Sequence, residues 1–304
     1  MAEVLTVHAP ATSANLGPGF DVLALALDVE NEVVVTRRPG PLAVRVTGEG
    51  AGEVGDDESN LVCRALSQGL PSLDGLEIEC RNHIPLGRGM GSSAAAVCAG
   101  LVAANALGGL RWSPHELLAR AGELEGHADN AAACLEGGIV AVAPGPRAVR
   151  IDAPSELCFV TVVPPVRVST DEARRALPAQ VPVSDAAVTL AHAVGLVLAL
   201  GEGRLDDLPA LLVDRLHEPY RASLVPGLDA LRALVDGEGC LGATISGSGP
   251  TVLLWARLSA AGEVAARARI AAPEAEVRVA RLSPSGVRAR WTSATAGRLE
   301  RSIG

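Results

Sequence analysis

The stretch of residues 85–95 combines glycines and serines in a spacing that suits phosphate binding. Three alternating glycines favour a loop up to Gly91, and two serines ahead of an alanine-rich run are typical of a helix N-terminus. Such a loop exposes several backbone N–H groups beside the positive end of the helix, and a serine hydroxyl there could ligate magnesium. In order, the residues are Pro85, Leu86, Gly87, Arg88, Gly89, Met90, Gly91, Ser92, Ser93, Ala94 and Ala95.

Two familiar phosphate-binding motifs do not fit this stretch. Its glycines are spaced G-x-G-x-G, whereas the dinucleotide fingerprint needs G-x-G-x-x-G. A Walker A loop needs a lysine, and all 26 basic residues of this chain are arginine. Lysine-dependent chemistry, including Schiff-base formation, is therefore excluded. On the glycines alone, a turn that merely joins a strand to a tightly packed helix explains the pattern equally well.

Two other segments place polar side chains where they could bind a small molecule. Asn15 and Asp21 lie on a glycine-rich stretch and could bind a hydroxyl or ammonium group, although such residues usually cap turns. Glu125 ends a predicted helix and runs into a His-x-Asp-Asn cluster at 126–130, which is more polar than packing requires. The alternative is a solvated helix end, with Asp129 as the cap of the next helix.

Three segments in order resemble the GHMP small-molecule kinases. Residues 85–95 look like the family's ATP-binding loop, P-x-x-x-G-x-G-S-S-A-A. Residues 239–251 resemble its glycine-rich third segment, whose expected role is to approach the other two segments. Residues 10–21 resemble its first segment in the form P-A-T-S-A-N-L-G-P-G-F-D, which marks the homoserine kinases within the family.

Three more segments resemble the homoserine-kinase branch. Residues 125–130 look like E-G-H-P-D-N, with Ala128 in place of the usual proline. Residues 169–174 match S-T-x-x-A-R, and residues 214–221 resemble the segment that ends in a second arginine. The resemblance therefore spans nearly the whole chain.

For the nucleotide, the resemblance implies ATP and Mg²⁺ as cofactors. The loop at 85–95 is expected to wrap the ATP phosphates. Ser93 and Glu125 are the implied Mg²⁺ ligands, with Glu123 in reserve because spacing in this region varies.

For the substrate, the resemblance implies that L-homoserine is held at both of its ends. The implied catalytic residues are Asn15, Asp21 and Asn130, which hold its amino and hydroxyl groups. Two arginines are expected on its carboxylate, because guanidinium groups offer bidentate, permanently charged donors. The implied substrate-binding residues are Asn15, Asp21, His127, Asn130, Arg174 and Arg221.

The implied activity is ATP-dependent phosphorylation of the homoserine side-chain hydroxyl, a step of threonine biosynthesis. Asn130 stands where several GHMP relatives carry a general-base aspartate, so the hydroxyl is expected to be positioned rather than fully deprotonated. Two rival functions stay open. A GHMP kinase for another alcohol, such as mevalonate, would lack the paired arginines, and a catalytically silent GHMP-fold regulator would lose the metal ligands.

Composition and sequence patterns limit which binding partners and which cellular location we expect. The formal net charge of −9 argues against nucleic acid. The six cysteines show no C-x-x-C pair, and the histidines at 8, 83, 115, 192 and 217 show no metal spacing, so both groups are expected to be structural. No signal peptide is visible, and the longest apolar run, 186–200, is too short to span a bilayer. We expect a soluble cytoplasmic protein without a membrane partner, and the resemblance allows a homodimer.

The element pattern predicts an α+β chain of two domains, 1–152 and 153–304. The resemblance implies a ribosomal protein S5 domain 2-like N-terminal domain with a left-handed βαβ unit and a ferredoxin-like C-terminal domain. Strands are predicted at 4–8, 32–38, 42–47, 76–82, 139–143, 149–151, 157–163, 251–256 and 277–281. Helices are predicted from Ser59 or Asn60 to 70, at 90–107, from Ser113, from Ser169 or Thr170, and at 184–200 and 205–213.

Overall fold

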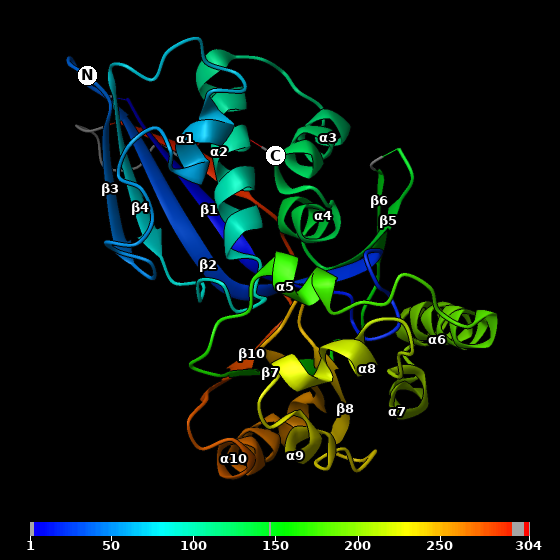
Figure 1. Cartoon of the computed structure of the whole chain (residues 1–304). Helices are drawn as coiled ribbons and strands as arrows, with labels where there is room; N and C mark the ends of the chain where they lie inside the picture. Colours follow the sequence, from blue (N-terminus) through cyan, green and yellow to red (C-terminus); the bar gives the residue numbers. More distant parts are fainter. Residues whose placement is uncertain (1–2, 146, 294–300, 304) are drawn as a thin grey trace.

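The chain builds two β-sheets with helices against them, one above the other in Figure 1. The computed structural model describes residues 3–145, 147–293 and 301–303. The candidate site residues come from both halves, because Arg174 and Arg221 lie in the second half, so the fold matters here for how it brings the loops of the two sheets together.

The first sheet has eight strands in the order β12-β11-β1-β2-β4-β3, and a β5–β6 hairpin pairs with β2. Strand β3 runs parallel to β4, and the other pairs are antiparallel. The bounds are β1 Glu3–Ala14, β2 Leu23–Arg37, β3 Ala43–Gly48, β4 Leu76–Asn82, β5 Ile139–Ala143, β6 Arg147–Ile151, β11 Arg288–Ser293 and β12 Arg301–Ile303.

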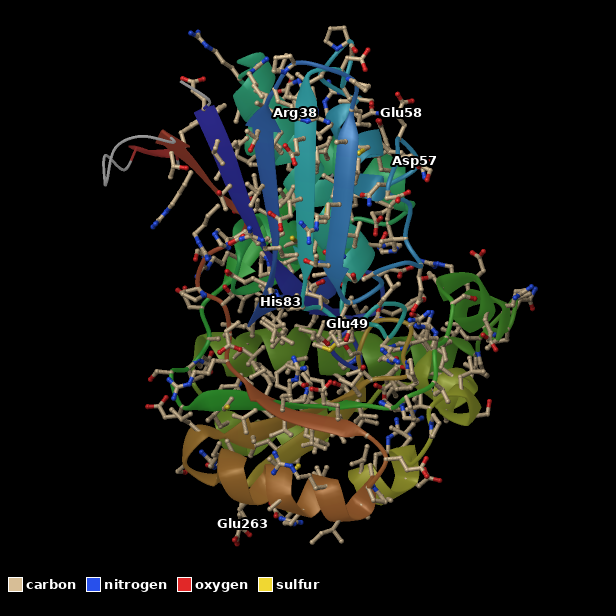
Figure 2. All side chains as sticks on the ribbon, turned by 90° about the vertical axis from the view of Figure 1, so that its left-hand side faces the viewer. Arg38, Glu49, Asp57, Glu58, His83 and Glu263 are labelled. Carbon is tan, nitrogen blue, oxygen red and sulfur yellow. The ribbon has the colours of Figure 1, made fainter. Side chains whose placement is uncertain are left out.

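Alternation explains why this sheet has two different faces. On β1, Leu5 and Val7 are fully buried while Thr6 and His8 are not. Helices α1 Leu61–Leu66, α2 Ser92–Gly108, α3 Pro114–Glu125 and α4 Asp129–Glu136 lie on the apolar side. Figure 2 looks onto the opposite side, where no helix stands in front of β1 to β4.

The helices begin largely where side-chain chemistry predicts. Asn60 caps α1 by accepting from the N–H of Val62, and Ser113 forms the predicted capping box with Glu116 on α3. The small residues of α2 allow close packing, because a Cβ at Gly100 would lie 2.6 Å from the Cβ of Ala65. Helix α2 thus packs closely against α1.

The second sheet has the order β10-β7-β9-β8. Its strands are β7 Leu157–Val163, β8 Cys240–Ile245, β9 Val252–Arg257 and β10 Glu276–Ala280. The helices of this half are α5 Thr170–Arg175, α6 Val183–Gly201, α7 Leu208–Leu211, α8 Glu218–Arg221, α9 Leu228–Arg232 and α10 Ala261–Ala271, with short 3₁₀ turns at Leu205–Asp207, Ala222–Leu224 and Leu258–Ala260. Residues of β7, β8, β9, α9 and α10 form a core of their own.

Helix α6 is longer than predicted and is only partly buried. It has 19 residues, and it is, in the described part of the chain, the one helix that is long and apolar enough to cross a membrane by length and composition. Only 22% of its most apolar window is buried. Leu196 and Leu200 pack into the main core, whereas Leu190 and Leu198 are exposed. The helix predicted at 184–200 is thus one residue longer at each end, and the apolar run 186–200, which was judged too short to span a bilayer, is only part of it.

The predicted domain boundary near residue 153 falls between β6 and β7, where one sheet gives way to the other. The end of the chain then crosses back, because β11 pairs antiparallel with β1 from Glu3 to His8. The first sheet therefore contains residues from both ends of the chain.

Candidate active site

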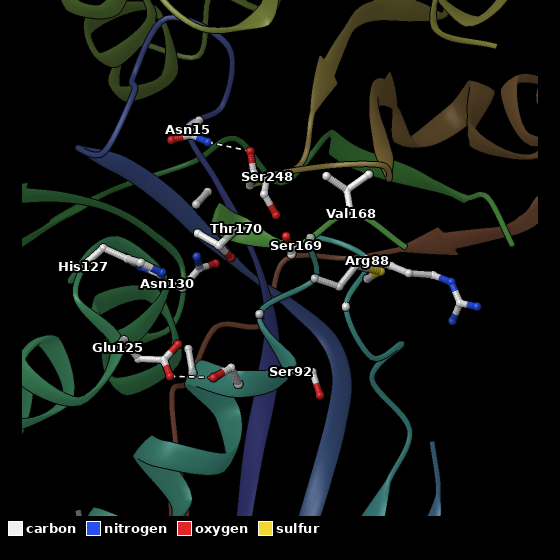
Figure 3. Close-up of a pocket in the computed structure, with 18 of the residues that line it drawn as sticks. Asn15, Arg88, Ser92, Glu125, His127, Asn130, Val168, Ser169, Thr170 and Ser248 are labelled. Atoms are coloured by element: carbon white, nitrogen blue, oxygen red, sulfur yellow. Dashed lines mark hydrogen bonds between the residues drawn. The ribbon is translucent and has the colours of Figure 1, made fainter. Parts of the chain in front are cut away.

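A cavity of about 360 Å³ collects most of the predicted site residues from both halves of the chain (Figure 3). Of the predicted loop, residues 85–94 line it, while Ala95 is fully buried. Every predicted substrate and metal residue also lines it: Asn15, Asp21, Ser93, Glu125, His127, Asn130, Arg174 and Arg221. Segments that are far apart in sequence therefore form one site.

The glycine-rich loop is held in a left-handed backbone. Gly87, Gly89 and Gly91 have φ angles of 66°, 75° and 70°, which other residues adopt only with strain. Gly91, not a serine, is the residue that caps α2, and it makes no side-chain cap bond. The helix predicted at 90–107 is Ser92–Gly108, so it starts two residues later than expected, and both serines lie in its first turn.

The glycine-rich third segment approaches this loop as predicted. The hydroxyl of Ser246 donates to the carbonyl oxygen of Gly89 at 2.6 Å, and a Cβ at Gly89 would overlap the carbonyl oxygen of Ser246. The N–H of Gly247 donates to the carbonyl oxygen of Ala14 at 3.0 Å, so this segment also contacts the end of β1.

The two predicted metal residues, Ser93 and Glu125, lie side by side at the mouth of α2. The hydroxyl of Ser93 donates to Oε1 of Glu125 at 2.6 Å. Glu123 is exposed and does not line the cavity. Within the described ranges, no group of three or more His, Cys, Asp and Glu side chains could hold a metal. A pair of oxygens suits Mg²⁺, which is usually held by one or two protein oxygens plus phosphates and water.

The loop between β1 and β2 carries strained polar residues. Asn15 and Asp21 have φ angles of 73° and 54°, unusual for residues other than glycine. The Asn15 side chain fixes this loop, because its Nδ2 donates to the carbonyl oxygen of Gly247 at 2.7 Å and its Oδ1 accepts from the N–H of Asp21 at 3.0 Å. Asp21 in turn accepts two hydrogen bonds from Arg174, at 3.1 and 3.2 Å.

Arg221 is a buried cation in the same cavity, with an exposed fraction of 3%. Its guanidinium donates to the carbonyl oxygens of Ala173 at 3.2 Å and Gly247 at 3.3 Å, and contacts Nδ1 of His217 at 3.4 Å. Burial lowers the pKa of Arg221, but an arginine still stays protonated. Among the described residues no carboxylate pairs with it. Its direct partners are neutral and it lines the cavity, so it is suited to bind an anionic ligand there.

Asn130 and His127 are each held by a neighbour. The Thr12 hydroxyl donates to Oδ1 of Asn130 at 2.7 Å. Nδ1 of His127 lies 2.9 Å from Oδ1 of Asp129, and this hydrogen bond raises the pKa of His127. Asp129 does not cap α4, since Ala128 occupies that position.

Comparison with known proteins places these features in a family. The model for the GHMP kinases N terminal domain matches residues 60–138, and that for the GHMP kinases C terminal domain matches residues 196–274. The homoserine kinase of Streptomyces coelicolor is 44% identical over 277 residues, covering 88% of this chain and 89% of that protein. The homoserine kinase of Moorella thermoacetica is 39% identical, covering 83% and 87%. The chain belongs to the homoserine kinases of the GHMP family.

The solved structures agree with this assignment. A homoserine kinase from Cytophaga hutchinsonii superposes with a TM-score of 0.86 at 32% identity, covering 94% of this chain and 97% of that one. The L. major mevalonate kinase, at 19% identity and a TM-score of 0.70, shares the fold alone. The predicted α+β, two-domain GHMP kinase fold is therefore confirmed.

Sequence reasoning missed several residues of this homoserine-kinase site. Thr12 was part of the first recognised segment but received no role, because nothing local indicates its bond to a residue 118 positions away. Ser169 and Thr170 were predicted only as helix caps, yet both line the cavity, as do Val168, Gly247 and Ser248. His217 was predicted to be structural, and it lies against Arg221.

Proposed function

We propose that this protein transfers the γ-phosphoryl group of ATP to the side-chain hydroxyl of L-homoserine, giving O-phospho-L-homoserine and ADP. The observation that carries the proposal is the buried Arg221, which has no carboxylate partner among the described residues and lies in one cavity with the phosphate-type loop. A kinase for an alcohol without a carboxylate would not need a buried cation at this place. Mevalonate also carries a carboxylate, and the feature that favours an amino acid over it is Asp21, a carboxylate in the same cavity that can bind an ammonium group. The affiliation with the homoserine kinases supports the same substrate.

In this proposal the Arg174–Asp21 ion pair opens to receive an α-amino acid. Asp21 and Asn15 would bind the ammonium group, and Arg174 and Arg221 would bind the carboxylate. Each charge of the pair then meets an opposite charge of the ligand, so the exchange leaves no charge unpaired. Because this pair is about 40% exposed on both sides, opening it costs little.

At the other end, residues 85–94 would hold the ATP phosphates through backbone N–H groups. Ser93 and Glu125 would hold Mg²⁺, which supplies neutralisation of the phosphate charge when bound. Thr12 fixes the Asn130 carbonyl oxygen, so the amide nitrogen of Asn130 is the group left to orient the homoserine hydroxyl. Orientation and charge neutralisation carry most of the acceleration in phosphoryl transfer, so a strong base is not needed.

The test is ADP release by the purified protein with MgATP and L-homoserine, L-threonine, L-serine or mevalonate. Selective turnover of L-homoserine is expected. Selective turnover of mevalonate would keep the nucleotide site and discard the amino-acid site, and MgATP binding without turnover would favour the silent regulator. A homodimer, a cytoplasmic location and the absence of nucleic-acid and membrane partners stay predictions from the sequence.

A further inference from the structure

His217 is a fully buried histidine between the two halves of the site. Its Nε2 lies 2.8 Å from the carbonyl oxygen of Gly17, a residue of the β1–β2 loop that is 200 positions away. Its ring stacks on Phe20 of the same loop, with 5.0 Å between centroids. Its backbone N–H donates to Oδ2 of Asp214 at 2.7 Å, which anchors the histidine in the second half of the chain.

The neighbours of His217 fix its tautomer. The guanidinium of Arg221 has only donors, so Nδ1 of His217 must accept from it. Nε2 then carries the proton and donates it to the Gly17 carbonyl oxygen. Burial lowers the pKa of this imidazole, which agrees with the neutral form.

The contacts of His217 reach both groups that would hold the amino acid. Arg221, which is proposed to bind the carboxylate, lies beside the His217 ring. The Arg221 guanidinium carbon also lies over the Phe20 ring, 5.2 Å from the centroid of that ring. The loop that it contacts carries Asn15 and Asp21, the proposed ammonium ligands, in left-handed conformations that need support from outside the loop. One side chain thus contacts the supports of both subsites.

We propose that His217 is a positioning residue that sets the distance between the ammonium and carboxylate subsites for the amino-acid substrate. This inference rests on the proposed function for the identity of the ligand. It predicts that changes at His217 weaken the binding of homoserine and leave the nucleotide end, which His217 does not contact, unchanged.

The experiment compares His217→Phe with His217→Gln in steady-state kinetics. Phenylalanine keeps the stacked ring and loses both polar contacts, while glutamine places an N–H near the position of Nε2 and keeps the bond to Gly17. We expect the homoserine KM to rise about tenfold or more in His217→Phe and to stay within about threefold in His217→Gln. The ATP KM should stay within about twofold in both variants.

His115→Phe is a control for the loss of one histidine–carbonyl hydrogen bond, because Nε2 of the exposed His115 also lies 2.8 Å from a glycine carbonyl oxygen, that of Gly145, outside this cavity. It should leave both KM values unchanged. If His217→Phe does not fold, His217→Asn replaces it, since asparagine is too short to reach Gly17. The inference would be overturned by an unchanged homoserine KM in His217→Phe or His217→Asn. It would also be overturned if the KM values for homoserine and ATP rose equally.

A second readout separates this inference from the proposed function. Hydrogen exchange at the backbone N–H groups of residues 16, 17 and 19–21 should be faster in His217→Phe than in wild type and close to wild type in His217→Gln, whichever alcohol is phosphorylated. Equal exchange in all three proteins would overturn the positioning role. Failure of the wild-type protein to phosphorylate homoserine would instead count against the proposed function.

Discussion

At the residue scale, the amino-acid end of the cavity is distinguished by how its charges are paired. Arg174 is half-exposed and already paired with Asp21, whereas Arg221 is buried and has neutral partners only among the described residues. The two arginines are therefore not equivalent. Arg221 provides a fixed cation, and Arg174 provides one that can move to the ligand.

The first prediction concerns Arg174→Ala. This change should raise the homoserine KM by more than about tenfold, because it removes a bidentate charged partner, and should leave the ATP KM within about twofold. Initial rates with each substrate varied in turn measure both values. Arg215→Ala is the control, since Arg215 forms an ion pair of similar length, 3.2 Å, with Asp185 outside the cavity. An unchanged homoserine KM in Arg174→Ala would refute the assignment.

The second prediction concerns the metal ligands. Glu125→Ala should lower kcat by about a hundredfold and raise the Mg²⁺ concentration needed for half-maximal rate, because the Ser93–Glu125 oxygen pair is lost. Glu123→Ala should change neither value, since Glu123 is exposed away from the cavity. Magnesium titrations of the three proteins measure this. If Glu123→Ala lowered kcat and raised the Mg²⁺ requirement while Glu125→Ala changed neither, Glu123 would be the ligand.

At the element scale, the sequence predicts best where turn residues bound a strand. The strands at 76–82, 139–143 and 157–163 have the predicted bounds. Strands β1 and β2 are longer than predicted. The prediction missed residues 9–14 and 23–27 because every residue in these two segments is buried, so they lack the alternation of apolar and polar residues that marks a half-buried strand. Helix α2 starts at Ser92 and not at residue 90 as predicted, since Gly91 before it is in a left-handed conformation.

The third prediction concerns the loop ahead of α2. Gly89→Ala should abolish measurable MgATP binding, because Gly89 has a left-handed φ and its new Cβ would overlap the Ser246 carbonyl oxygen. Gly109→Ala is the control. It imposes a similar left-handed φ of 59° at the other end of α2, with no atom within 4 Å of its Cβ, and should cost only about 1 kcal/mol of stability. Calorimetric titration with MgATP compares the ATP affinity of the two variants. Equal affinity in Gly89→Ala and Gly109→Ala would contradict the expected clash.

At the scale of the whole molecule, the parts that sequence reasoning could not predict depend on long-range contacts. The pairing of β11 with β1 joins the two ends of the chain, and the contact between His217 and Gly17 joins the two halves of the site. Local patterns carry no information on such pairs. Family segments predicted the residues of the cavity, but not the residues that support them, such as Thr12 and His217.

The fourth prediction concerns pH and global stability. Burial raises the pKa of Glu218 to about 7, against the smaller opposing effects of the Ile245 N–H and Arg232. Between about pH 4.5 and 7 the folded protein therefore holds a proton that the unfolded chain has released. This stabilisation is complete below that range and is lost as the pH rises through about 7.

Glu218→Gln isolates this effect, because glutamine stays neutral at every pH. The stability of wild type relative to Glu218→Gln should fall by up to about 3 kcal/mol between about pH 5 and 8. Urea unfolding at several pH values measures the difference. A relative stability that rises with pH would mean that Glu218 is charged in the folded protein and stabilised by Arg232.

The central claim is that one cavity holds a nucleotide and an amino acid so that phosphoryl transfer occurs between them. The most direct measurement is phosphorus NMR of the protein with MgATP and L-homoserine. We expect a phosphomonoester signal on the homoserine side-chain oxygen that grows in step with ADP and grows about a hundredfold more slowly in Glu125→Ala. ADP formation with release of inorganic phosphate and no phosphohomoserine would contradict the claim.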